Sequence, residues 1–148
     1  MTRKALALAL LAVVATAGCK GTGGGRTDEF GPVTLQDQIA ARFGTFIDCV
    51  MSEDYEGIRP LALASQAAGF DPRAFVEERF RMKLGSFQVV VWDKRFIGVT
   101  PVRGKPYYLS TAAANARIYS TNEVKRVFVN LYWQKQGGEW YIVPFAGS

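Results

Sequence analysis

The side chains available for proton transfer in this chain are carboxylates and tyrosines, because the sequence contains no histidine. Histidine is the side chain best suited to proton transfer near neutral pH, so mechanisms built on a histidine and aspartate pair are excluded. A carboxyl group and a tyrosine hydroxyl in an apolar pocket could still act as acid and base. The candidates are Asp48, Asp54, Tyr55 and Tyr132. Asp48 lies away from the apolar stripe of its predicted helix, so we expect its carboxylate to be solvated. We expect Tyr55 to be a packing residue with its hydroxyl at the surface.

Metal and nucleophile chemistry have little support in this sequence. Zinc and other soft ions prefer thiolate or imidazole ligands, and the chain offers only Cys19 and Cys49. The acidic residues Glu53, Asp54 and Glu56 lack the alternating oxygen ligands of a calcium loop. No serine has the flanking glycines of a nucleophile elbow. We therefore expect no metal and no cofactor, and we favour a domain without catalytic activity.

The amino-terminal residues have the layout of a secretory signal that ends in a cysteine. Arg3 and Lys4 precede an apolar run from Ala5 to Val14, and a short stretch of small residues leads to Cys19. The apolar run is too short to span a bilayer as a permanent helix. The pattern resembles the bacterial lipoprotein signal, although Thr16 stands where that signal usually carries Leu, Val or Ile. The alternative is an ordinary cleaved signal followed by a coincidental cysteine.

The lipoprotein resemblance implies removal of residues 1–18 and lipidation of Cys19. The protein would then be anchored by lipid in a bacterial cell envelope. Lys20 after the cysteine implies the periplasmic face of the outer membrane if the cell has two membranes. Residues 19–33 are rich in glycine and predict a flexible tether, and residues 34–148 predict one domain. Cys49 would be the only free thiol, so no intramolecular disulfide is expected.

The charge of the chain argues against nucleic-acid binding. The formal net charge is +5, and it falls to +3 without residues 1–18, which carry two basic and no acidic side chains. The basic residues are scattered rather than gathered on one predicted element. The small clusters at Lys94-Arg95 and at 103–105 are typical of solvated hairpin tips. We therefore expect no nucleic acid as a partner, and the expected contact with the membrane is through the lipid anchor.

The spacing of apolar residues predicts three helices followed by strands. The first helix begins at Thr34 and runs for about five turns, with apolar residues three and four positions apart. A short second helix follows 52–54, contains Pro60 and ends at Gly69. The third helix begins at Asp71 as N-cap and extends to Gly85. Alternating and β-branched residues then predict strands at 86–92, 96–102, within 106–120, at 124–136 and at 140–145. This order indicates an α+β domain, with three N-terminal helices packed on one face of a mostly antiparallel sheet.

The longest predicted strand has two different faces. Val127, Val129, Leu131 and Trp133 make one apolar face, which we expect to belong to the core. The opposite face joins a neighbouring segment to form a mixed surface; its members are Tyr107, Arg117, Tyr119, Arg126, Phe128, Asn130 and Tyr132. This surface could be a wall for a small apolar ligand, a homodimer contact, or a solvated face with cross-strand aromatic pairs. Between the first two we favour the homodimer contact.

Two motifs carry a resemblance to a known fold. The segment 55–61, Tyr-Glu-Gly-Ile-Arg-Pro-Leu, follows an acidic turn, and 131–143 combines an aromatic strand with Gly-Glu-Trp-Tyr-Ile. Together with the element order they resemble the nuclear transport factor 2-like superfamily, which includes the SnoaL-like proteins, over about residues 34–145. The resemblance implies a curved sheet wrapped around helices into a cone with a pocket. That superfamily includes dehydratases, isomerases and members that only bind or scaffold, so the fold alone does not assign an activity.

Three functions are consistent with these features of the sequence. We favour a membrane-anchored envelope lipoprotein whose domain binds a ligand or scaffolds an envelope protein without catalysis. The first alternative is an isomerase or dehydratase that uses a carboxylate and a tyrosine in the cone. The second alternative is a structural subunit of an envelope complex.

Overall fold

The computed structural model describes residues 33–147, and from Leu35 onward these residues form one compact unit. Cys19, the expected signal peptide and all but Val33 of the expected tether lie outside the described residues. Within the described part, helices precede strands in the order α2 (Leu35–Met51), η1 (Tyr55–Leu61), η2 (Ala64–Gly69), α3 (Pro72–Phe80), β1 (Phe87–Pro101), β2 (Tyr108–Ile118), β3 (Val124–Gln136) and β4 (Glu139–Ile142). None of the helices in this part has the length and apolar character needed to cross a membrane.

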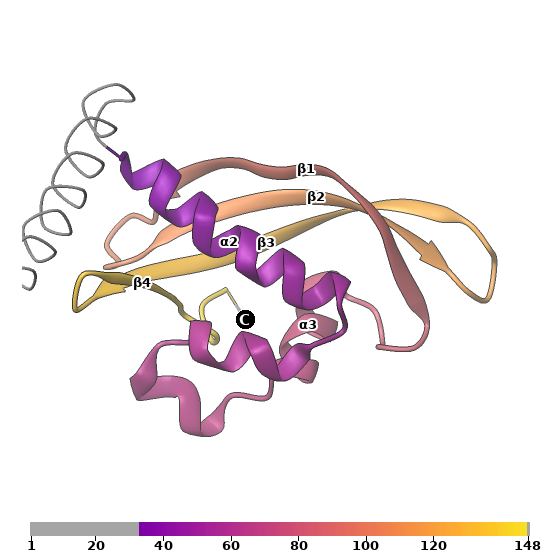
Figure 1. The fold of residues 1–148 in the computed structure, drawn as a ribbon, viewed down its shortest axis with the longest axis horizontal. Helices are drawn as coiled ribbons and strands as arrows, with labels where there is room; N and C mark the ends of the chain where they lie inside the picture. Colours follow the sequence, from indigo (N-terminus) through magenta and orange to yellow (C-terminus); the bar gives the residue numbers. More distant parts are fainter. Residues whose placement is uncertain (1–32, 148) are drawn as a thin grey trace, which may run out of the picture. The chain divides into compact units, whose positions relative to one another are not determined.

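The sheet is an antiparallel meander in which strands lie in the order of the sequence, β1-β2-β3-β4. Helix α2 lies across one face of this sheet (Figure 1). The expected α+β class, with helices before an antiparallel sheet, is therefore confirmed. The expected division of β3 into a core face and an outer face is confirmed for Val129, Leu131 and Trp133, which are buried, and for Phe128 and Asn130, which are exposed. Val127, expected on the core face, is only half-buried.

Large side chains fill the space between α2 and the sheet. Helix α2 buries one stripe, made of Ile39, Phe43, Phe46, Ile47 and Val50. Trp133 of β3 is fully buried, and its ring centroid lies 6.1 Å from that of Phe43. Its indole Nε1 donates a 2.7 Å hydrogen bond to Ser110 Oγ, so the polar atom of this core residue is satisfied. Each large apolar side chain buried here contributes roughly 1.5–3 kcal/mol.

The second expected helix is instead two consecutive 3-10 helices, η1 and η2. Pro60 lies inside η1 and has no backbone N–H to donate to a helical carbonyl, which favours the short, tight geometry. Asp54 begins η1, because its carboxylate accepts a hydrogen bond from the Gly57 amide at 3.1 Å. The first predicted helix, which begins at Thr34, corresponds to α2, which begins one residue later at Leu35.

Helix α3 begins where the sequence indicates and ends earlier. Asp71 caps it by accepting hydrogen bonds from the amides of Arg73 and Ala74. It ends at Phe80 rather than Gly85, because Arg81 adopts the left-handed conformation with φ of 56°.

The two strands expected at 86–92 and 96–102 are wrong as separate elements, because they form the single strand β1. The alternating pattern is interrupted between the two predicted strands, which indicated a turn. In the structure β1 continues through this interruption and pairs with β2 with three register irregularities. The basic pair Lys94-Arg95 consequently lies inside β1 and not at a hairpin tip. Arg95 Nη2 pairs with Asp48 Oδ1 of α2 at 2.8 Å, which ties this strand to the helix. The expected closing strand is also shorter, because β4 ends at Ile142.

Candidate functional site

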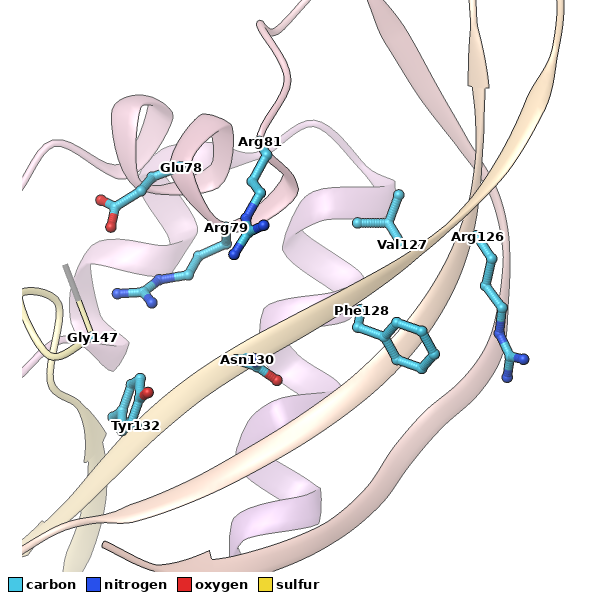
Figure 2. A pocket seen from close by; sticks show the side chains of 9 residues that line it. All are labelled: Glu78, Arg79, Arg81, Arg126, Val127, Phe128, Asn130, Tyr132 and Gly147. Atoms are coloured by element: carbon cyan, nitrogen blue, oxygen red, sulfur yellow. The ribbon is translucent and has the colours of Figure 1, made fainter.

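A cleft of about 420 Å³ lies between α3, β3 and the carboxyl-terminal residues (Figure 2). Helix α3 and the residue after it contribute Glu78, Arg79 and Arg81. Strand β3 contributes Arg126, Val127, Phe128, Asn130 and Tyr132, and Gly147 completes the lining. Four residues of the surface expected from the sequence therefore line one cavity, and all four belong to β3.

Arg79 is the buried cation of this cleft, with 9% of its surface exposed. Its Nη2 donates 2.9 Å hydrogen bonds to the carbonyl oxygens of Pro144 and Ala146. The guanidinium carbon lies 4.8 Å from the ring centroid of Phe75 and 5.9 Å from that of Tyr132. Its Nε is buried without a hydrogen-bond partner in the described part of the chain. Burial lowers the pKa of Arg79 and nearby Glu78 raises it, and an arginine remains protonated in either case.

The charges of the cleft do not cancel. Among residues 33–147, neither Arg79 nor Arg81 forms an ion pair with a carboxylate. Figure 2 shows both side chains extending from the α3 side, whereas Arg126 projects away from α3. Arg126 Nη2 pairs with Asp93 Oδ2 at 2.7 Å. Glu78, next to Arg79 on α3, is the one acidic side chain among the described residues that line the cleft. It does not balance the two arginines that have no ion-pair partner, so the cleft carries positive potential.

One edge of β3 is open beside this cleft. Strand β4 pairs with β3 only from Trp133 to Gln136. The Val143 amide then donates a 2.8 Å hydrogen bond to the carbonyl oxygen of Tyr132. From Tyr132 back to Val124, no described strand pairs with this side of β3.

The structure brings some of the expected surface residues together and separates others. Tyr107 packs edge-on against Tyr132, with ring centroids 5.6 Å apart. Asn130 Oδ1 accepts a 2.8 Å hydrogen bond from Thr111 on the neighbouring strand.

Arg117 and Tyr119 lie at the far end of the same face. Arg117 is paired in register with Val124, eight residues from Tyr132 along β3 and so roughly 27 Å away at about 3.4 Å per residue. Tyr119 is exposed just beyond β2. Neither residue lines the cleft.

The acid and base candidates do not form one site with Tyr132. Asp48 is exposed, as expected, and pairs with Arg95. Asp54 caps η1, and Tyr55 packs partly buried against the core beneath the guanidinium of Arg73. In residues 33–147, no group of three or more histidine, cysteine or acidic side chains is placed to hold a metal ion.

Sequence reasoning missed the contributions of α3 and Gly147. A signal for Arg79 was present, because it follows Phe75 by four residues and so lies on the same buried face of the helix. Gly147 has φ of 78°, and a Cβ built there would lie 2.6 Å from Tyr132 Cε2, so the close approach of the chain to this ring requires glycine. Nothing in the local sequence indicates that contact.

Comparison of this chain with protein-family models and with curated protein sequences finds no match.

Proposed function

We propose that this protein is a lipid-anchored envelope protein whose α+β domain binds an anionic ligand or partner without catalysing a reaction. The observation that carries the proposal is the cleft beside β3, in which neither Arg79 nor Arg81 forms an ion pair with a carboxylate of the described residues. Guanidinium groups bind carboxylates and phosphates through paired, charge-assisted hydrogen bonds. This lining favours an anion over the small apolar ligand expected from the sequence.

The anchor and the location belong to the same proposal. The signal layout that ends at Cys19 supports lipidation, and Lys20 supports the periplasmic face of the outer membrane in a cell with two membranes. The cone-shaped, nuclear transport factor 2-like architecture is also part of the proposal. Its support is the order of helices followed by an antiparallel meander.

Binding is favoured over isomerase or dehydratase chemistry because the carboxylates considered for it are engaged elsewhere. Asp48 pairs with Arg95, and Asp54 caps a helix. The large aromatic side chains that fill the space between α2 and the sheet also favour a site at the rim of the domain.

A homodimer or an envelope-protein contact is the second candidate, and the outer face of the sheet favours it. Phe128 is 56% exposed on that face, and Val91 and Val124 are also exposed. Register places these three residues with Arg126 on one side of the sheet. A partner that covers this face would remove these apolar side chains from water, which favours association.

A thermal-shift titration with citrate tests the anion site. The full chain in detergent micelles is titrated with citrate and, separately, with sodium chloride at equal ionic strength. We expect citrate to raise the Tm saturably, because a ligand that binds only the folded state stabilises it. Arg81→Gln should lose most of this rise, whereas Arg103→Gln, an exposed residue in the turn between β1 and β2, should keep it. Equal effects of citrate and chloride on the wild type would contradict the proposal.

A further inference from the structure

The open edge of β3 is regular enough to accept another strand. β3 pairs with β2 from Val124 to Trp133 without a register irregularity, so its backbone keeps an even geometry over this length. β4 covers only the last part of the strand. An edge of this kind presents a row of unpaired amides and carbonyls that template pairing with another chain.

The register identifies which backbone groups face outward. The carbonyl oxygen of Tyr132 accepts from the Val143 amide and so points to the open side. Hydrogen-bonding direction alternates along an antiparallel strand, so the amides and carbonyls of Arg126, Phe128 and Asn130 point the same way. No backbone hydrogen bond from another described residue reaches these groups. All three residues are exposed.

The opposite edge of the sheet is β1, which carries features that natural proteins use to prevent unwanted strand pairing. β1 has three register irregularities and carries Lys94, Arg95 and Pro101. Bulges, lysine and proline are the usual means of protecting an edge strand. β3 also carries basic residues, Lys125 and Arg126, but it has no bulge and no proline from Val124 to Tyr132. The difference between the two edges indicates that β3 is the edge fit for pairing.

The cleft supplies side-chain contacts next to this edge. Val127 and Phe128 are successive residues and therefore present apolar surface on the two faces of an added strand. Arg79 and Arg81 form the other side of the cleft. A segment between α3 and β3 would thus meet backbone groups along one side and cations along the other.

We propose that the cleft and the open edge together bind an extended acidic polypeptide segment, which adds to β3 as a strand and directs its carboxylates to Arg79 and Arg81. This inference rests on the proposed anion-binding function. Strand addition takes affinity from main-chain hydrogen bonds and specificity from alternate side chains. A second copy of the chain fits less well, because its β3 would bring Lys125 and Arg126 toward a site that is already positive.

Backbone-modified peptides test strand addition directly. The probe is an eight-residue peptide of alternating glutamate and valine, acetylated and amidated at its ends, titrated into the full chain in detergent micelles. Two analogues carry N-methyl groups either on all the glutamates or on all the valines. Only alternate amides of an added strand face β3, so one analogue should bind at least about tenfold more weakly while the other binds like the parent.

Protein variants and amide exchange locate the bound peptide. Arg81→Gln should weaken peptide binding several-fold, and Arg103→Gln should leave it unchanged. A peptide with lysine in place of glutamate should not bind. Residue-resolved hydrogen exchange should show slower exchange at the amides of Arg126, Phe128 and Asn130 when the peptide binds. The amides of Val127 and Val129 face β2 and should not change.

Three outcomes would overturn the inference. Equal binding by the parent peptide and both N-methylated analogues would show that no strand forms, and a retained citrate response would then leave the proposed function standing. Absence of both citrate and peptide binding would overturn the two proposals together. A dimer in native mass spectra, with the three outward amides protected before peptide is added, would show that a second copy occupies the edge.

Discussion

Arg79 joins α3 to the carboxyl-terminal residues and also charges the cleft. Its hydrogen bonds to the carbonyls of Pro144 and Ala146 hold that segment in place. A buried cation without a carboxylate is costly, and the rings of Phe75 and Tyr132 offset part of this cost. Because one side chain serves both purposes, its removal would perturb folding and binding together. The exposed Arg81 is therefore the better position for testing the cleft.

The buried hydrogen bond between Trp133 and Ser110 gives a stability prediction. Ser110→Ala removes the acceptor of the indole N–H and leaves a buried donor unsatisfied, which should cost about 1–3 kcal/mol of unfolding free energy. Urea unfolding measures the change. Ser120→Ala, at an exposed turn position, should change stability by less than about 0.5 kcal/mol. A similar small loss for Ser110→Ala would contradict the assigned hydrogen bond.

Cys49 gives a reactivity prediction with a defined pH dependence. Partial burial raises the pKa of its thiol, and the carboxylates of Asp54 and Asp48 raise it further. The reactive thiolate is therefore scarcer in the folded protein than in the unfolded chain at the same pH. In a Cys19→Ser background, reaction with a disulfide reagent should be slower in native buffer than in urea, and its rate should rise at higher pH. Coincident pH profiles in the two conditions would refute this expectation.

At the scale of elements, one glutamate organises the connection between α3 and β1. A Glu77 carboxylate oxygen accepts a 2.9 Å hydrogen bond from the Leu84 amide, and Lys83 Nζ lies 3.1 Å from the other oxygen. The chain leaves α3 at Arg81 and returns to this carboxylate before β1 begins. The Glu77 carboxylate therefore holds the segment after α3 against the helix.

Glu77→Gln should lower stability in a pH-dependent way. The Leu84 amide, and then Lys83, lower the pKa of Glu77 in the folded state below its ordinary value of 4.5. A lowered carboxyl pKa contributes stability that is present above the unfolded pKa and is lost as pH falls through the folded pKa. Urea unfolding should show the variant less stable at pH 7, with the difference shrinking below about pH 4.5. The exposed Glu123→Gln serves as control, and a difference that persists unchanged in acid would contradict the mechanism.

The elements with strong apolar periodicity were predictable, and those set by pairing were not. The bounds of β3 agree with the sequence pattern, and α2 begins one residue later than expected. Both have a stripe of buried residues at a regular spacing, which is a local property of the chain. The sequence predicts two strands where the structure has the single strand β1, because irregular residues break the alternating pattern. Only the pairing with β2 shows that the strand continues through these residues.

At the scale of the whole molecule, the predicted lipid anchor would hold the cleft at a membrane, which sets where it meets its ligand. Wild-type protein expressed in a bacterium should incorporate labelled palmitate and sediment with the membrane fraction. Cys19→Ser should incorporate no label, because the acylated thiol is absent. Cys49→Ser serves as control and should be labelled like the wild type. Label in the Cys19→Ser variant, or none in the wild type, would refute lipidation at this residue.

Part of the candidate site could be predicted from the sequence. Period-two alternation places Arg126, Phe128, Asn130 and Tyr132 on one face of a strand, so their grouping followed from the sequence. The sequence also predicted that Arg117 belongs to this group, but Arg117 lies far from Tyr132 along the same sheet. Alternation identifies a face and not a position along that face, because position depends on the register between strands.

By itself the sequence determined the α+β class, the order of helices before strands, the two faces of β3 and the absence of histidine chemistry. These properties depend on local spacing and composition. Only the tertiary structure decided that α3 lies beside the open edge of β3, with Arg79 and Arg81 in one cleft with Tyr132. That juxtaposition joins residues about fifty positions apart through packing and register, which no local pattern encodes.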